Sequence, residues 1–397
     1  MNPHITVMDC RLIELERAFH GYKFFGVPLL SATPQSLTSA GLGDDPGSYY
    51  FVSLLATHLN MGLGPAIDLF YHALIAIGFI FGLIGVFAAY RQNSCRIVGF
   101  LYLYRIASLA LETGDVYIAF SFAALSVIPL SLYFFADLDG EKRVSSLKLL
   151  IPFMILSGLI IAIANSIRSH SGTGVLIFVL VLILSRGYFS RLRRSGLVIT
   201  LFLGVLAVNL FFSHQISVRD AFLSKENPGC SRISSTAPFW HIAYLGLGYL
   251  KNEYVDEAAI ARVREIAPDA AYLSEEYGNV LKREVLGKLF NEPLEVGRVV
   301  FSKMLVVIDY FFIFCNFGLM FILLTKCNRP LEAAFILSLA FNSLFVIISI
   351  PRVRYLLGFA SIASIYAFVK INQYIMTRKR DDSAELLQES LQPVIIE

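Results

Sequence analysis

Charged side chains are scarce in this chain of 397 residues, where Asp, Glu, Lys and Arg together make up 16%. An average soluble domain carries roughly 25%. Apolar residues make up 56%, the mean hydropathy is +0.65, and several apolar runs approach the length of about 20 residues that crosses a bilayer as a helix. This composition excludes an ordinary soluble domain and predicts an all-α polytopic membrane protein.

Two further features are missing from the sequence. The five cysteines show no CxxC or paired spacing, so neither a disulfide framework nor a thiolate metal site is expected. Residues 1–40 contain no basic stretch followed by an apolar one, so they do not form a cleavable signal peptide.

The apolar runs predict nine transmembrane helices, six within 66–213 and three within 299–373. Residues 1–65 then form an N-terminal segment with an acidic loop, 214–298 a long helical loop, and 374–397 a tail. The predicted spans are 66–90, 95–112, 115–136, 147–166, 172–190, 195–213, 299–324, 331–350 and 353–373.

Basic residues gather in alternate connections between these spans, and the positive-inside rule makes those connections cytoplasmic. They contain Arg91 and Arg96, Lys142 and Arg143, Arg186, Arg191, Arg193 and Arg194, Lys326 and Arg329, and Arg378 to Arg380. The other connections, including 1–65 and 214–298, are then external. We expect an integral protein of a bacterial inner membrane with a cytoplasmic C-terminus.

This orientation puts residues 1–65 outside the membrane, although no spanning segment precedes them. Two explanations are open. A short N-terminal region is translocated without help, or the natural protein has a further N-terminal helix that this sequence lacks. We favour the second.

The long external loop contains an aromatic stretch that includes Trp240 and His241 and is too short and too polar to span. Such a stretch suits the membrane interface. Helical spacing of apolar residues predicts two amphipathic helices at 256–267 and 270–290, separated by Pro268. His241 is a candidate acceptor-side base or metal ligand. An ordinary interfacial histidine is favoured, because no second His or acidic residue stands at ligand spacing.

Four polar groups fall on the predicted external side, and together they supply the parts of a site for a phosphate-bearing substrate. Arg binds phosphate through two parallel hydrogen bonds, and a carboxylate can take a proton from an acceptor hydroxyl. The four groups are Asp44 with Asp45, Glu112 with Asp115, the loop that begins at Arg168, and Arg352 with Arg354. Each alone is equally consistent with an ordinary polar loop at the membrane surface.

Three of these patterns resemble the GT-C superfamily of membrane glycosyltransferases, which includes protein O-mannosyltransferases and the aminoarabinose lipid A transferase. Members typically carry an acidic pair in the first external loop, followed by a Tyr-bearing amphipathic helix. Asp44-Asp45 and Tyr49-Tyr50 match that pattern, with Glu112 and Asp115 in the second external loop and Arg354-Tyr355 opening a late helix. The resemblance covers residues 41–190 and 350–370 loosely.

The resemblance implies an enzyme that moves a sugar from a polyprenyl-phosphate carrier to a lipid or glycan acceptor, with no nucleic acid partner. Asp44 or Asp45 would be the base, with Glu112 and Asp115 assisting, in one version through a divalent cation. Arg352, Arg354 or Arg168 would hold the donor phosphate, and Trp240 and His241 would lie on the acceptor side. In that family a spanning helix precedes the acidic loop, and this is the element that the charge pattern also requires.

Two other functions fit part of the sequence. Polymerases and ligases of surface polysaccharide, of the O-antigen type, also combine many spans with a large external loop and external Arg residues, but they do not generally need the acidic pair. A transporter or an assembly protein is the other alternative. Transporters usually place charged sites at mid-depth, where this chain has only Arg105 and Asp309. An enzyme with an external site is therefore preferred.

Overall fold

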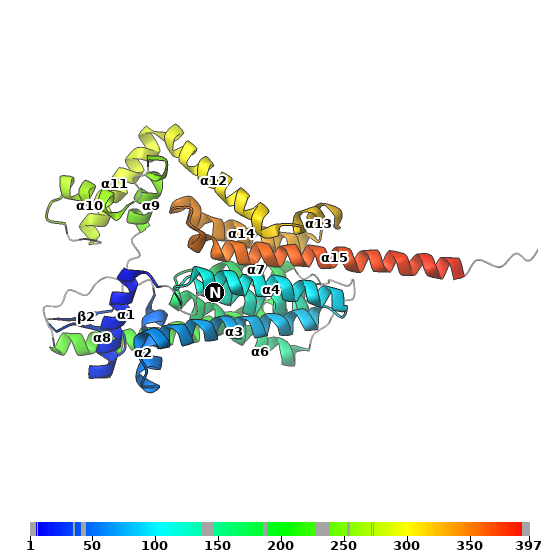
Figure 1. The fold of residues 1–397 in the computed structure, drawn as a ribbon, viewed down its shortest axis with the longest axis horizontal. Coiled ribbons are helices and arrows are strands. Elements are labelled where there is room, and N and C mark those ends of the chain that lie inside the picture. The colour runs from blue at the N-terminus through cyan, green and yellow to red at the C-terminus, as the bar shows by residue number, and fades with distance from the viewer. Residues whose placement is uncertain are drawn as a thin grey trace, which may run out of the picture.

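The computed structural model describes residues 5, 7–34, 36–40, 45–136, 146–185, 187, 189–226, 239–251, 255–270, 272 and 274–390. Over these residues the chain is almost entirely α-helical, apart from a two-stranded antiparallel hairpin. Figure 1 shows a long bundle with a separate helical lobe near one end.

In the part of the chain that the structure describes, seven helices are long and apolar enough to cross a membrane, so the chain is an integral membrane protein. They are α3 (Leu63–Ala89), α4 (Asn93–Thr113), α5 (Ile118–Phe135), α6 (Leu147–Ile167), α8 (Arg191–Glu226), α14 (Arg329–Ile348) and the span Val353–Lys379, which combines the 3₁₀ turn η2 (Val353–Leu356) with most of α15 (Leu357–Ser390). The prediction of an all-α polytopic membrane protein is confirmed.

The remaining two predicted spans differ from simple transmembrane helices. The span predicted at 299–324 is a broken pair, α12 (Pro293–Cys315) and α13 (Gly318–Leu324), which meet at 90°. The break lies at Asn316, whose φ of 47° is left-handed. The span predicted at 172–190 is the shorter apolar helix α7 (Thr173–Ser185). Within the described residues there are therefore seven candidate spans, or eight if the broken pair is counted as one, where the sequence predicted nine.

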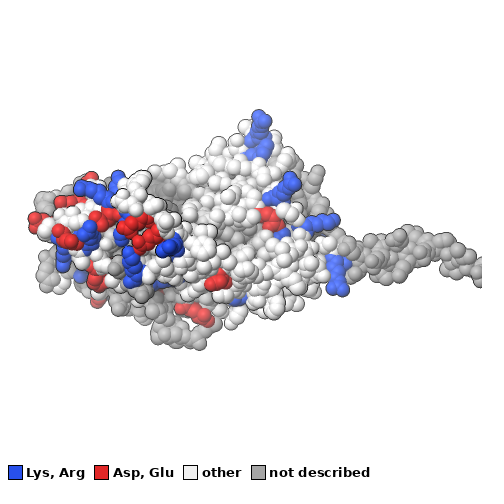
Figure 2. Space-filling view, turned by 90° about the horizontal axis from the view of Figure 1, so that it is seen from above, with Lys and Arg blue, Asp and Glu red and all other residues white. Residues whose placement is uncertain are grey.

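Helices α5 and α15 lie at the centre of the bundle. In each of them, 89% of the most apolar stretch of 18 residues is buried. The other spans bury half or less of theirs and present apolar side chains such as Ile80, Ile84 and Phe87 outward. Figure 2 shows the result as a broad uncharged zone, with charged residues gathered toward the two ends. This surface suits a hydrocarbon environment between two aqueous ones.

At one end of the bundle lie α1 (Asp9–Phe25), the hairpin β1 (Leu30–Ala32) and β2 (Leu37–Ser39), and α2 (Pro46–His58). Helices α1 and α2 run across the direction of the bundle (Figure 1). Helix α8 extends beyond 213, where its apolar run ends, because Leu223 packs against Val27 and Leu30 beneath the hairpin. The end that the charge pattern predicts to be external is thus covered by the N-terminal segment.

A second lobe, which we call the cap, comprises α9 (Phe239–Leu247), the 3₁₀ turn η1 (Tyr249–Lys251), α10 (Asp256–Ile266) and α11 (Glu275–Asn291). It has its own small apolar core around Leu245, Val263 and Leu281. Helices α10 and α11 correspond to the two amphipathic helices predicted from the sequence. The cap contacts the bundle through α12 and α14.

Candidate active site

Two aspartates and two arginines from four separate segments meet where α1 covers the bundle. Arg11 lies on α1, Asp45 directly precedes α2, Asp115 lies between α4 and α5, and Arg168 follows α6. We call these four residues the tetrad. All four side chains are largely buried, the aspartates to 4% and 5% exposure and the arginines to 11% and 17%.

Arg11 bridges the two carboxylates. Its Nε and Nη2 each lie 2.9 Å from Oδ2 of Asp45, and its Nη1 donates to Oδ2 of Asp115. Arg168 donates from Nη1 to Oδ1 of Asp45 at 3.1 Å. Two cations therefore face two anions, and the tetrad is electrically neutral. Buried charges need such pairing, since unpaired ones are strongly destabilising.

Local sequence places both carboxylates. Pro46 occupies the first turn of α2, where a proline is tolerated, and Asp45 stands at the N-cap. Gly114 and Asp115 both have positive φ, 66° and 58°, and make the tight connection between α4 and α5. Asp is among the residues that tolerate this conformation, and Oδ1 of Asp115 accepts a hydrogen bond from the N–H of Val116 at 2.8 Å.

Burial and the neighbouring charges shape the titration of the tetrad. Burial raises the pKa of Asp115 above its ordinary value, and the charge of Arg11 only partly offsets this. Burial also acts to lower the pKa of Arg11, but Asp45 and Asp115 outweigh it and the pKa is raised. Arg11 is therefore a permanent cation between the two carboxylates.

An aromatic pair connects the tetrad to Arg354. The ring of Tyr117 lies under the guanidinium of Arg168 at 5.3 Å and under that of Arg354 at 6.0 Å. Tyr355 meets Tyr117 edge-on at 5.3 Å. Among the described residues Arg354 forms no ion pair with a carboxylate, and its side chain is half-buried. Among the described side chains next to the neutral tetrad, this arginine is therefore a surplus positive charge.

The structure brings three of the predicted site residues together with Arg354 and leaves two at the surface. Glu112 is exposed on the last turn of α4, and Arg352 is exposed at the start of η2. Asp44 lies outside the described residues. The sequence analysis missed Arg11 and Tyr117. Arg11 lies within the segment 1–65, which the charge pattern places on the same side as the carboxylates, and no other signal in the sequence distinguishes it.

Trp240 and His241 belong to the cap, and the contacts of His241 are internal to it. His241 is buried, with Nδ1 2.8 Å from the hydroxyl of Tyr277 and Nε2 3.1 Å from Oδ1 of Asp256. Trp240 packs on the apolar core of the cap, with the ammonium of Lys282 over its ring at 5.8 Å. His241 thus has an acidic neighbour fifteen positions away, which the sequence argument about ligand spacing overlooked.

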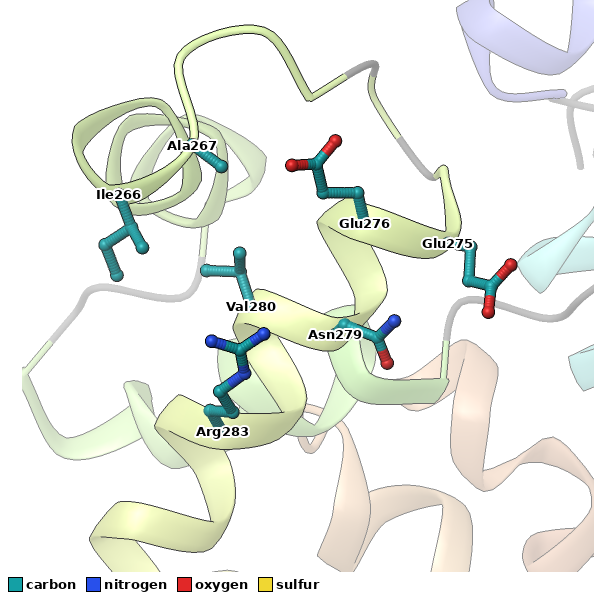
Figure 3. A pocket seen from close by; sticks show the side chains of 7 residues that line it. All are labelled: Ile266, Ala267, Glu275, Glu276, Asn279, Val280 and Arg283. Carbon is teal, nitrogen blue, oxygen red and sulfur yellow. The ribbon is translucent and has the colours of Figure 1, made fainter.

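The cap also contains a pocket of about 520 Å³ between the end of α10 and the first turns of α11. Figure 3 shows Glu276 above Val280, with Arg283 at the other end. The lining residues are Ile266, Ala267, Glu275, Glu276, Asn279, Val280 and Arg283. Its charged side chains are all exposed, and no residue of the tetrad lines it.

The predicted divalent cation does not fit the tetrad. Within the described part of the chain no group of three or more His, Cys, Asp or Glu side chains could hold a metal ion. Asp45 and Asp115 share the guanidinium of Arg11, which lies where an ion bridging them would have to lie. The exposed Glu112 adds no third ligand.

Comparison with known proteins gives one weak structural similarity. No protein-family model matches the chain, and no curated protein matches it. Among solved structures, the apo crystal structure of ArnT from Cupriavidus metallidurans is similar to it over 94% of this chain and 73% of that chain, with 12% identity and a TM-score of 0.37. A TM-score this low supports neither a reaction nor a substrate for the present chain.

Proposed function

We propose that this chain is an integral membrane glycosyltransferase that moves a sugar from a polyprenyl-phosphate carrier to a lipid or glycan acceptor on the external face. One observation carries the proposal. Two buried carboxylates and a surplus arginine, far apart in the sequence, converge at one end of a membrane bundle. A carboxylate for the acceptor and a cation for the leaving phosphate are what such a transfer requires.

Arg354 is the best candidate for the donor phosphate. Because the tetrad is neutral, the positive charge of Arg354 is not cancelled by it. Its guanidinium lies over the rings of Tyr117 and Tyr355, at 6.0 and 5.9 Å, and its side chain is half-buried rather than fully enclosed. Arginine pairs with phosphate through its planar fork, and a phosphate on a membrane lipid would lie near this end of the bundle. Arg168 is the less suited candidate, since it already bonds to Asp45.

Asp115 is the better candidate for the base. Asp45 accepts three contacts from two arginines, which stabilise its anionic form and weaken it as a base. Asp115 has one arginine contact, and burial raises its pKa. In the proposed reaction the acceptor hydroxyl oxygen bonds to the anomeric carbon of the sugar and the bond from that carbon to the phosphate oxygen breaks. The hydroxyl proton goes to Asp115, and polyprenyl phosphate leaves as an anion beside Arg354.

The test uses a product that is independent of the sugar and the acceptor. Release of polyprenyl phosphate is measured in membranes containing the native lipid-linked sugars. Asp115→Asn should lower the rate on the order of 10²- to 10⁴-fold, the usual contribution of a general base. Glu112→Gln, an exposed carboxylate on the preceding helix, is the matched control and should change little.

A second pair compares arginines two positions apart. Arg354→Gln should raise the KM for the donor, and Arg352→Gln, which alters an exposed arginine, should not. Full activity of the Asp45→Asn/Asp115→Asn double variant would overturn the proposal. That result would favour a polysaccharide polymerase or ligase, which does not need the carboxylates.

A further inference from the structure

A buried lysine binds the C-terminal end of α14. That end of the helix lies close in sequence to Arg354. Lys303 lies on α12 and is 1% exposed. Its Nζ donates to the carbonyl of Ile347 at 3.0 Å and to the carbonyl of Ser349. The last carbonyls of a helix have no partner within it and carry the negative end of the helix dipole, so an ammonium is well stabilised there. Lys303 therefore caps α14 from a neighbouring helix.

Helix α9 of the cap packs against the same end of α14. A Cβ on Gly246 of α9 would lie 1.9 Å from the carbonyl oxygen of Ile348 and 3.0 Å from Nζ of Lys303. Only glycine allows this approach of two backbones. Tyr249, next to α9, places its ring 5.9 Å from the Lys303 ammonium. The end of α14 is thus held between α12 and the cap.

A short segment connects this point to the surplus arginine. After Ser349 the chain passes through the buried Ile350, whose carbonyl accepts a hydrogen bond from the N–H of Arg352 at 2.8 Å. The turn η2 follows at once and carries Arg354 and Tyr355 against Tyr117. A shift of the end of α14 would move Arg354 with it, because little chain lies between them to absorb the shift.

We propose that Lys303, braced by Gly246, is a positioning residue that holds Arg354 where it binds the donor phosphate. The inference rests on the proposed function and adds to it a structural connection from the cap to the donor site. A purely structural role, in which Lys303 only stabilises the end of α14, makes a different prediction. It would lower the stability of the protein without acting through Arg354.

The test measures binding of undecaprenyl phosphate to the purified full chain in detergent micelles. Lys303→Met keeps the apolar stem and removes the donors. It should weaken binding between about ten- and a hundredfold, the range that a misplaced binding group can cost. Lys225→Met, on an 83% exposed lysine of α8, is the matched control and should not change binding.

A double variant identifies the route of the effect. If Lys303 acts through Arg354, then Lys303→Met/Arg354→Gln should bind no more weakly than Arg354→Gln alone. Losses that multiply in the double variant would overturn the inference. Because Lys303→Met could also misfold, Gly246→Ala provides a second test against Gly287→Ala, where a Cβ on α11 meets nothing within 4 Å. Gly246→Ala should weaken binding, and equal binding by both glycine variants would count against the inference.

The outcomes separate this inference from the proposed function. If Arg354→Gln weakens binding and Lys303→Met does not, the positioning role is wrong and the proposed function stands. If the wild-type chain does not bind undecaprenyl phosphate, or Arg354→Gln binds as well as wild type, the proposed function fails and the inference fails with it.

Discussion

Replacing Arg11 by Met would test how much the ion pairs of the tetrad contribute to the free energy of unfolding. The substitution keeps the length of the stem and removes the guanidinium that bridges two carboxylates of 4% and 5% exposure. Asp45 retains Arg168, whereas Asp115 loses the one arginine contact that it makes among the described residues. Removing one partner of a buried pair costs about 3–5 kcal/mol, because a buried charge is left uncompensated. We expect a loss of that size in the free energy of unfolding.

The assay is unfolding of the purified protein in mixed micelles, followed by helical circular dichroism. Arg17→Met is the control on the same helix, since the pair of Arg17 with Glu14 is partly exposed and should contribute at most about 1 kcal/mol. Adding Asp115→Asn to Arg11→Met removes the stranded carboxylate and should recover part of the loss. If Arg11→Met lowers the free energy of unfolding no more than Arg17→Met does, or if adding Asp115→Asn restores none of the loss, then Arg11 does not stabilise the fold by compensating the buried carboxylate of Asp115.

Two further predictions concern Asp115, and a third concerns the packing of α2 on α6. Asp115 must be ionised to take a proton, and burial raises its pKa, so the rate of polyprenyl phosphate release should rise with pH through a value above 3.8. Arg11→Met should move this rise to higher pH, because the charge of Arg11 lowers the pKa of Asp115. A rate that does not change with pH would contradict the assignment of Asp115 as the base. The same shift means that the contribution of Asp115 to the free energy of unfolding is greatest below pH 3.8 and falls as the pH rises through its folded pKa. Gly47→Ala would place a Cβ 2.3 Å from Oγ of Ser166 and push α2 from α6, so we expect a loss of about 1–3 kcal/mol in unfolding experiments. Gly64→Ala meets nothing within 4 Å and should differ clearly from it, and equal losses would show that α2 does not pack closely on α6.

The apolar runs predicted the spans well because length and hydropathy are sufficient to identify a membrane helix. They could not predict how those helices end. Asn316 breaks α12 from α13 although the apolar run continues across it, so hydropathy alone gives one span. Helix α8 continues past its apolar run because Leu223 has a partner in the hairpin, a tertiary contact that no local pattern contains.

Charge pattern and topology placed Asp45, Asp115, Arg168 and Arg354 on the same side, and in the structure three of them share one cluster with the fourth beside it. The partner that connects the carboxylates was not predictable. Arg11 and Asp115 are 104 positions apart, and nothing in the residues around Arg11 distinguishes it from Arg17. Which arginine enters the cluster depends on how α1 lies across the end of the bundle.

The arrangement of the tetrad also determines how an acceptor could reach Asp115. In the proposed reaction, a hydroxyl that binds Oδ2 of this carboxylate would compete with the contact from Nη1 of Arg11. Arg11 would still hold Asp45 through Nε and Nη2, so the exchange leaves no cation unpaired. It also moves the guanidinium somewhat away from Asp115, so that its charge offsets the effect of burial less, and the carboxylate becomes a stronger base. In the proposed reaction, acceptor binding would therefore itself activate the base, and Asp45 would serve to retain Arg11 while that happens.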